Sequence, residues 1–300
     1  MKLALKVDVD TSRGTREGVR RLREVLKRHG AGATFLFSLG RDHTGRAIRR
    51  VFRPGFVRKV SRTSAVEHYG IRTLLYGTLL PGPDIGRSCA DILRGVRDAG
   101  FEVGVHGYDH VLWQDNVTTR DRDWTREQMS RAVERFHEIF GVPARTHGAA
   151  GWQMNAHAYE LEEEFGFTHA SDVRGTRPFL PVFEGRAGRV PQLPTTLPTL
   201  DELVGSNDRT PDNVHEAVLS LTASSSRDHV YTLHAELEGM KWLPTFERLL
   251  SGWRRQGYEL VSIEALFRSL PPGGLPKHDV VMGEVPGRSG TLAVQGAPSD

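Results

Sequence analysis

The sequence predicts an α/β fold in which parallel strands and helices alternate around an irregular (β/α) barrel. A strand, a helix and a second strand are all indicated within residues 3–37, which is typical of a parallel βαβ unit. Regular alternation resumes near residue 88 and continues through a last short helix after residue 262. With 300 residues and 38% apolar content, the chain is long enough to bury one large core.

The first third of the chain contains the clearest elements. An apolar run at residues 3–9 predicts a buried strand, and similar runs predict strands at 33–37 and 101–105. Apolar residues at helical spacing predict a helix over 19–26, and a second helix is expected near 88–99.

The later elements are predicted from shorter signals. Thr125 is expected to open a helix, with Gln128 as its capping-box partner. Short apolar runs predict further strands near 144–150, 167–171, 190–193, 229–233 and 258–262. Helices are expected near 156–165, near 243–253 and after 262.

We expect one barrel domain over residues 1–295, interrupted by a basic insert at 41–85. Gly and Pro become frequent from Pro271 onward, so we expect extended coil over the body there and a disordered tail at 296–300.

The composition restricts the type of site and the compartment. Cys89 is the single cysteine, which excludes an internal disulfide and a cysteine-based zinc site. Lys6 interrupts the first apolar run, which argues against a signal peptide, and no apolar run reaches the length of a membrane span. We therefore expect a cytoplasmic protein.

Positive charge is concentrated in the insert. Residues 41–80 hold nine basic and two acidic side chains, whereas the rest of the chain holds 31 basic and 35 acidic ones. Within 48–60 the basic residues alternate with apolar ones, a pattern that favours short amphipathic helices on an anionic membrane surface. Residues 46–80 are therefore predicted to contact the inner face of the cytoplasmic membrane. The alternative is a hairpin packed on the barrel, and a nucleic-acid partner is not expected because no binding motif is present.

Polar residues stand at the ends of several predicted strands, where (β/α) barrels place their active sites. Asp8 and Asp10 end the first strand and point to one side, because alternate strand residues share a face. His106 and His110 follow a later strand, and His234 ends another. Two histidines and one carboxylate form a common catalytic metal site, suited to Zn²⁺, Mn²⁺, Co²⁺ or Fe²⁺.

These residues resemble a known family, the polysaccharide deacetylase (NodB-like) metal-dependent amidohydrolases. The resemblance implies a distorted (β/α)7 barrel, and it extends over about residues 2–295. Within the family the local strings are most similar to those of the deformylases that act on 4-deoxy-4-formamido-L-arabinose linked to undecaprenyl phosphate. The strings are Val7-Asp8-Val9-Asp10-Thr11, Ala149-Ala150-Gly151-Trp152, Ser171-Asp172-Val173-Arg174-Gly175 and Leu233-His234-Ala235-Glu236.

The resemblance also implies a role for each site residue. Asp10, His106 and His110 would bind a divalent metal (Zn, Mn or Co). Asp8 would be the general base, His234 the general acid, and Asp172 would hydrogen-bond His234. A backbone N–H in 149–152 would stabilise the oxyanion. The products would be formate and a free-amine sugar lipid, for lipid A modification and resistance to polymyxin and other cationic peptides.

The sequence departs from the broader family at two places. Val9 separates the two aspartates, and the string after Arg145 lacks the proline of the family's Arg-x-Pro-x-Gly motif. The group that orients Asp8 is therefore open, with Arg13 and Arg174 as candidates. Trp152, Arg174 and Glu236 are candidate sugar or phosphate contacts, and His147 has no expected role.

Three other functions fit parts of the pattern. An N-deacetylase of another glycan or amino-sugar lipid would use the same site. A glycosyltransferase could use the Asp-x-Asp pair for a Mn²⁺-nucleotide but would leave the histidines without a role. A sugar-lipid binding protein would keep the insert and tolerate loss of Asp8 and His234.

Overall fold

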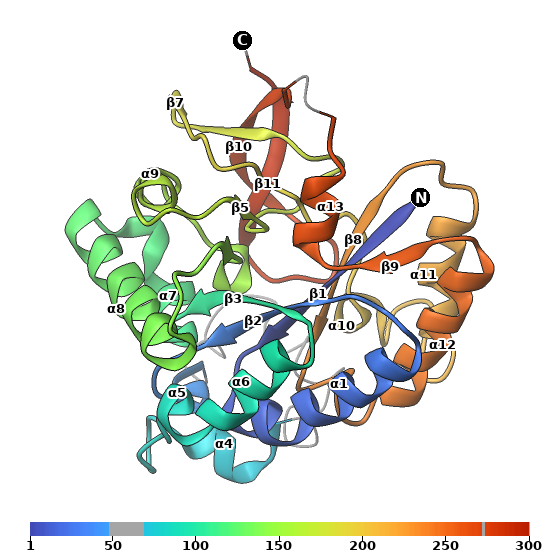
Figure 1. Cartoon of the computed structure of the whole chain (residues 1–300), viewed down its shortest axis with the longest axis horizontal. Coiled ribbons are helices and arrows are strands. Elements are labelled where there is room, and N and C mark those ends of the chain that lie inside the picture. The colour runs from blue at the N-terminus through green and yellow to red at the C-terminus, as the bar shows by residue number, and fades with distance from the viewer. Residues whose placement is uncertain (48–68, 272–273, 300) are drawn as a thin grey trace.

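The main sheet is a curled, entirely parallel half-barrel, seen in a computed structural model that describes residues 1–47, 69–271 and 274–299 (Figure 1). Its strands run in the order β5-β4-β3-β2-β1-β8, and β9 also pairs with β1. Their bounds are β1 Lys2–Val9, β2 Thr34–Ser38, β3 Glu102–Gly107, β4 Thr146–His147, β5 His169–Ala170, β8 His229–His234 and β9 Glu259–Val261. The predicted α/β barrel class is confirmed.

Most of the expected helices are present. The longer ones are α1 Val19–Arg28, α6 Ala90–Asp98, α8 Arg122–Phe140, α9 Ala156–Glu164, α11 Val214–Ala223, α12 Leu243–Arg255 and α13 Ile263–Arg268. Shorter ones are α4 Ile71–Leu75, α5 Ile85–Ser88, α7 His110–Asn116 and α10 Leu200–Leu203, with helical turns η1 Gly14–Gly18, η3 Val117–Thr119 and η4 Ala150–Trp152. The predicted start of α8 is wrong, since Asp121 caps it by accepting a hydrogen bond from the Trp124 N–H.

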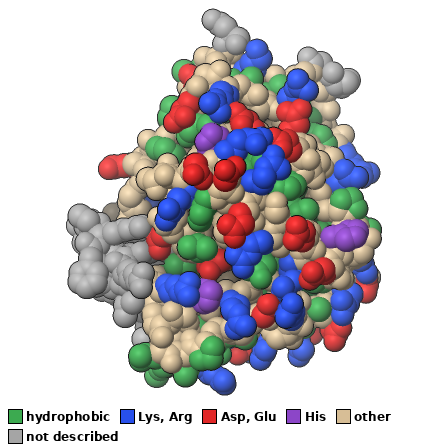
Figure 2. All heavy atoms as spheres, turned by 90° about the vertical axis from the view of Figure 1, so that its left-hand side faces the viewer, with side chains coloured by type: hydrophobic (Ala, Val, Ile, Leu, Met, Phe, Trp, Pro, Cys, Tyr) green, Lys and Arg blue, Asp and Glu red, His purple; other side chains and the backbone are tan. Residues whose placement is uncertain are grey.

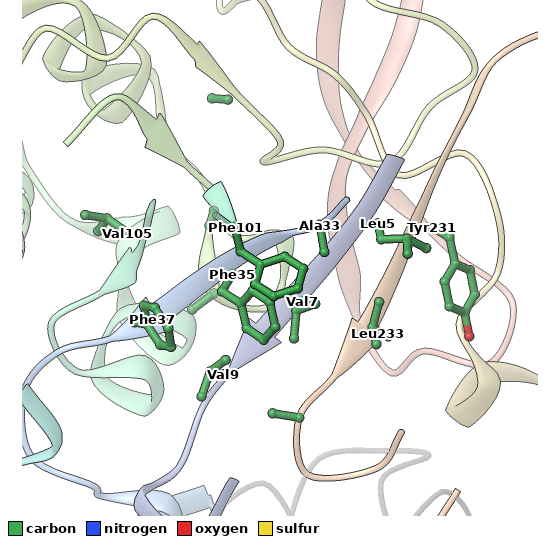
Figure 3. Packing of buried hydrophobic residues seen from close by; sticks show 14 of the residues in the cluster. Leu5, Val7, Val9, Ala33, Phe35, Phe37, Phe101, Val105, Tyr231 and Leu233 are labelled. Carbon is green, nitrogen blue, oxygen red and sulfur yellow. The ribbon is translucent and has the colours of Figure 1, made fainter. Parts of the chain in front are cut away.

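The two faces of β1 have different roles. Leu5, Val7 and Val9 point into the main core, where Figure 3 shows them packed with Phe35 and Phe37 of β2. Because successive side chains alternate, Lys6 and Asp8 point to the opposite face. The buried apolar face therefore fixes the strand's register and presents the polar residues on the inner side.

A second sheet covers the end of the barrel near the C-terminus, at the top of Figure 1. It has the order β11-β10-β6-β7, with bounds β6 Leu180–Phe183, β7 Arg186–Ala187, β10 Lys277–Glu284 and β11 Thr291–Pro298. The predicted coil after Pro271 and the disordered tail from residue 296 are therefore wrong. A two-stranded hairpin is only marginally stable by itself. This β10–β11 hairpin is stabilised because β10 also pairs with β6, which lies far away in the chain.

The base of the insert is attached to two loops of the barrel. Asp42 accepts a hydrogen bond from the Ser12 N–H after β1, and His43 contacts Asp109 after β3. The amphipathic helices predicted within 48–60 lie outside the described residues, as do residues 48–68 in general. Among the helices that the structure does describe, none combines the length and apolar character needed to cross a bilayer.

Candidate active site

The polar residues predicted at strand ends are brought to one rim of the barrel. Asp8 pairs in register with His234 of the neighbouring strand β8. His106 lies in β3, and His110 is the first residue of α7, whose N-terminus is capped by Asp109. Parallel pairing aligns the C-terminal strand ends, so residues distant in sequence share this rim.

Asp10, His106 and His110 form a candidate metal-ligand set. Nε2 of His106 lies 3.2 Å from Asp10 Oδ1, and Nε2 of His110 lies 3.5 Å from the same oxygen. The three ligand atoms lie within 4.8 Å of one another. This is the two-histidine, one-carboxylate set predicted from the sequence, and it leaves coordination positions for water and substrate.

The chemistry of these donors fits a divalent ion. His106 Nδ1 donates to the Gly148 carbonyl at 2.6 Å, so the neutral ring turns the Nε2 lone pair toward Asp10. Asp10 Oδ1 is buried without a hydrogen-bond partner among the described residues. Burial alone would lower the pKa of His106, but Asp8 and Asp10 outweigh it and raise that pKa. The two carboxylates therefore favour positive charge at this place, which a divalent ion would supply.

Asp8 is paired with a cation that the sequence reasoning missed. The fully buried Lys6 lies two residues earlier on the same face of β1, with Nζ 3.5 Å from Asp8 Oδ2. The ammonium also donates to the Ser171 carbonyl at 2.8 Å. The sequence signal for this pair is a lysine inside an apolar strand, two residues before a carboxylate on the same face.

The two arginines considered as partners of Asp8 lie elsewhere. Arg13 forms an ion pair with Glu17 at 3.3 Å, and Arg174 binds Glu202. Lys6 is therefore the cation that the structure places beside the candidate base.

The hydrogen bond expected between Asp172 and His234 is not formed. Asp172 accepts from the Ala149 N–H at 2.7 Å and from Gln192 Nε2 at 2.8 Å, and it contacts His147 Nδ1 at 2.9 Å. His234 Nδ1 has no hydrogen-bond partner in the described part of the chain. The prediction was wrong because Asp172 follows β5, next to β4 and its His147, whereas His234 ends β8.

A second buried cluster contains His147, Glu162 and Asp172. His147 Nδ1 lies 2.8 Å from Glu162 and 2.9 Å from Asp172. Burial opposes a charged imidazole, but Asp172 and Glu162 outweigh it and raise the pKa of His147 to about 10. The proton on His147 Nδ1 already lies between the two carboxyl groups. We therefore expect no metal here, although the spacing of the three side chains alone would allow one.

Glu236 supports the loop that carries Asp10. Its Oε1 accepts from the Asp10 N–H, the Thr11 N–H and the Thr11 hydroxyl. Gly14 is required at this contact, since a Cβ there would lie 2.0 Å from the same oxygen. Glu236, a candidate sugar contact in the sequence analysis, therefore has a structural role with this oxygen.

Trp152 lies among three cations beside the site. Lys6 Nζ, Arg174 Cζ and Arg288 Cζ lie 5.2, 5.1 and 4.8 Å from its ring centroid. Trp152 is buried, and Arg174 and Arg288 both form ion pairs with Glu202. These contacts hold the Trp152 ring and the two guanidinium groups in place beside the site. Arg288 comes from the turn between β10 and β11, which the sequence analysis treated as coil.

The two clusters are expected to differ in metal binding. We expect apo protein to bind one equivalent of Zn²⁺ or Co²⁺ per chain, and His110→Ala to weaken that binding by at least about 100-fold, because one of three ligands is lost. Glu162→Gln should leave it unchanged. Equilibrium titration monitored by the Co²⁺ absorption spectrum measures both. Loss of binding in Glu162→Gln with retention in His110→Ala would contradict the assignment.

Comparisons with known proteins agree with this geometry. Residues 3–170 match the family model described as polysaccharide deacetylase. A protein of Shewanella sediminis named "Probable 4-deoxy-4-formamido-L-arabinose-phosphoundecaprenol deformylase ArnD" is 36% identical over 294 residues, covering 98% of this chain and 94% of the relative. A protein of Wigglesworthia glossinidia brevipalpis with the same name is 29% identical over 284 residues, covering 94% and 98%.

Solved structures show the same fold at low sequence identity. A polysaccharide deacetylase structure from Mycobacterium smegmatis superposes with a TM-score of 0.60 at 17% identity, covering 95% of each chain. One from Pseudomonas aeruginosa superposes with a TM-score of 0.59 at 14% identity, covering 89% of this chain and 90% of the other. From the family match and the near full-length relatives, the chain belongs to the polysaccharide deacetylase family.

Proposed function

We propose that this protein is a metal-dependent deformylase that hydrolyses the formamide of 4-deoxy-4-formamido-L-arabinose carried on undecaprenyl phosphate. The observation that carries the proposal is the single rim on which a metal-ligand set, a carboxylate base and a histidine acid meet. The substrate follows from the deformylase relatives, which match almost the whole chain. The product, a free-amine sugar lipid, would serve lipid A modification and resistance to cationic peptides.

Asp10, His106 and His110 would hold the divalent ion, and Asp8 stays outside this set as the general base. A divalent ion here supplies Lewis acidity, which lowers the pKa of water and polarises the formyl oxygen. Lys6 lies beside the Asp8 carboxylate, which would accept a proton from the attacking water.

His234 would protonate the leaving nitrogen. Its place opposite Asp8 in the β1–β8 register supports this role, because the two residues lie at adjacent strand ends within reach of one substrate. The His234 main chain is fixed by Glu238, which accepts from its N–H at 2.9 Å.

Two backbone N–H groups of the predicted oxyanion stretch are already engaged. The Ala149 N–H donates to Asp172, and the Trp152 N–H donates to the Ala149 carbonyl. Ala150 and Gly151 are therefore the candidate donors to the oxyanion within this stretch.

The proposed activity is tested by measuring formate release from the formamido-arabinose polyprenyl phosphate in detergent. Metal-restored enzyme should release formate, metal-stripped enzyme should not, and Asp8→Asn and His234→Ala should each lower kcat by about 100-fold or more. The matching acetamido lipid is assayed in parallel. Acetate as the main product would instead identify an N-deacetylase, and release of neither acid with any metal would refute the hydrolase.

Lys6 should be needed for turnover and not for metal binding. Lys6→Met keeps the length of the side chain and removes the ammonium, so kcat/KM should fall by about 100-fold with unchanged metal content. Lys2→Met, on the same strand with a half-buried side chain beside Glu259, should stay within about twofold of wild type. Equal rates for the two variants would exclude Lys6 as the partner of the base.

We also propose that the enzyme binds the cytoplasmic face of the membrane, where its lipid substrate lies, through exposed apolar residues of the segment 69–80 at the base of the insert. Ile71, Leu79 and Leu80 are exposed large hydrophobics, with 68%, 80% and 37% of their surfaces accessible. In Figure 2 hydrophobic side chains gather along the lower edge of the molecule, the edge where Figure 1 shows α4. Arg46, whose side chain is 40% exposed, and the basic composition of 41–80 favour anionic headgroups.

Substitution of this surface should weaken membrane binding. Leu79→Ser removes an exposed apolar side chain and should lower partitioning onto phosphatidylglycerol vesicles by about tenfold in a sedimentation assay. Leu221→Ser, at an exposed leucine of α11, is the matched control and should bind like wild type. Equal binding by both variants would place the lipid contact elsewhere.

A further inference from the structure

The buried cluster around Asp172 lies next to the candidate metal site but shares no residue with it. It joins His147 of β4, Glu162 of α9, Asp172 after β5, and Gln192. Gln192 Nε2 donates to Asp172 Oδ2 at 2.8 Å and to Glu162 Oε2 at 3.3 Å, and the Asp172 N–H donates to Gln192 Oε1 at 3.0 Å. All four side chains are buried.

The pKa values of the two acids in this cluster are shifted in opposite directions. Burial and the nearby Asp172 raise the pKa of Glu162 well above its usual value. Burial opposes ionisation of Asp172, but His147 outweighs it and lowers the pKa of Asp172. These opposite shifts favour the carboxylate form at Asp172 over Glu162, with His147 beside it.

One peptide unit connects Asp172 to the metal-ligand set. The N–H of Ala149 donates to Asp172 Oδ1 at 2.7 Å, and the carbonyl of Gly148 accepts from His106 Nδ1 at 2.6 Å. These two groups belong to the same planar peptide bond and point in opposite directions. A chain of hydrogen bonds thus runs from the Asp172 carboxylate through a peptide dipole to the imidazole of His106.

Packing holds this peptide in place. A Cβ at Gly148 would lie 2.2 Å from Leu36 Cδ1 and 3.0 Å from Lys6 Cε, so the backbone is in close contact with β1 and β2. The His106 ring is 2% exposed and has little room to turn.

We propose that Asp172 is a positioning residue for the metal ligand His106 and acts through the Gly148–Ala149 peptide. The inference rests on the metal site of the proposed function. An anionic acceptor on the N–H polarises the peptide, strengthens its carbonyl as an acceptor, and so fixes His106 with Nδ1 protonated and Nε2 directed at the ion. Partners of this kind on a metal-bound histidine typically contribute 10- to 100-fold in metal affinity.

The test is the metal dissociation constant of purified full-length variants, measured by Co²⁺ titration and by Zn²⁺ competition with a chelator. Asp172→Asn, which keeps an oxygen acceptor but loses the charge, should weaken binding by about 10-fold. Asp172→Ala, which loses the acceptor, should weaken it by about 100-fold. Glu162→Gln is the matched control, because it changes an acid of the same cluster that does not contact the peptide, and it should bind like wild type.

A second measurement separates positioning from loss of folding. Thermal melting of each variant identifies temperatures at which it is folded. ¹⁵N NMR of His106 in the apo protein, recorded at a pH above the raised pKa of its ring, reports its tautomer there. Wild type and Glu162→Gln should show Nδ1–H, and Asp172→Ala should show a mixture of tautomers.

The outcomes are distinguishable. Wild-type affinity and an unchanged His106 tautomer in both Asp172 variants would overturn the inference. Equal weakening in Glu162→Gln would also overturn it, because the effect would then belong to the whole cluster. Absence of metal binding by wild type would instead refute the metal site of the proposed function.

Discussion

The site depends on two carboxylates at the end of one strand. Asp8 is buried in β1 and Asp10 is half-buried directly after it, and like charges in a poorly hydrated place need cations nearby. The two carboxylates have different partners in the structure. Asp8 has the fixed ammonium of Lys6, whereas Asp10 has two imidazoles whose nitrogens also suit a divalent ion. This asymmetry supports different proposed roles for two chemically similar residues.

The surrounding backbone is shaped around these two charges. Glu236 accepts three hydrogen bonds from the Asp10–Thr11 segment, and its carboxyl group reaches that segment only because Gly14 has no side chain. On the other side, the Gly148 carbonyl orients His106. The Glu236 side chain after β8 and the Gly148 carbonyl after β4 therefore hold Asp10 and His106 in place, and such preorganisation is what a metal site requires.

Several predictions failed where the answer lay in contacts between distant segments. The predicted coil after Pro271 is instead the β10–β11 hairpin, which pairs with β6 and brings Arg288 to the wall of the site. Asp172 was expected beside His234 and is bound to His147 and Ala149 instead. In the sequence Lys6 is only a charge that interrupts an apolar run, with no sign of its contact with Ser171. Local periodicity carries no information about which strands become neighbours, so none of these pairings could be read from it.

The sequence by itself determined the α/β class, the barrel strands around β1, and the residues Asp8, Asp10, His106, His110 and His234. It could do so because apolar runs define buried parallel strands and because such strands deliver their last residues to one rim. Only the tertiary structure decided which group neutralises Asp8, which residue Asp172 binds, and where the C-terminal strands lie. Those outcomes depend on strand order and on packing between segments more than a hundred residues apart, such as Lys6 and Ser171, and a linear pattern does not encode that distance.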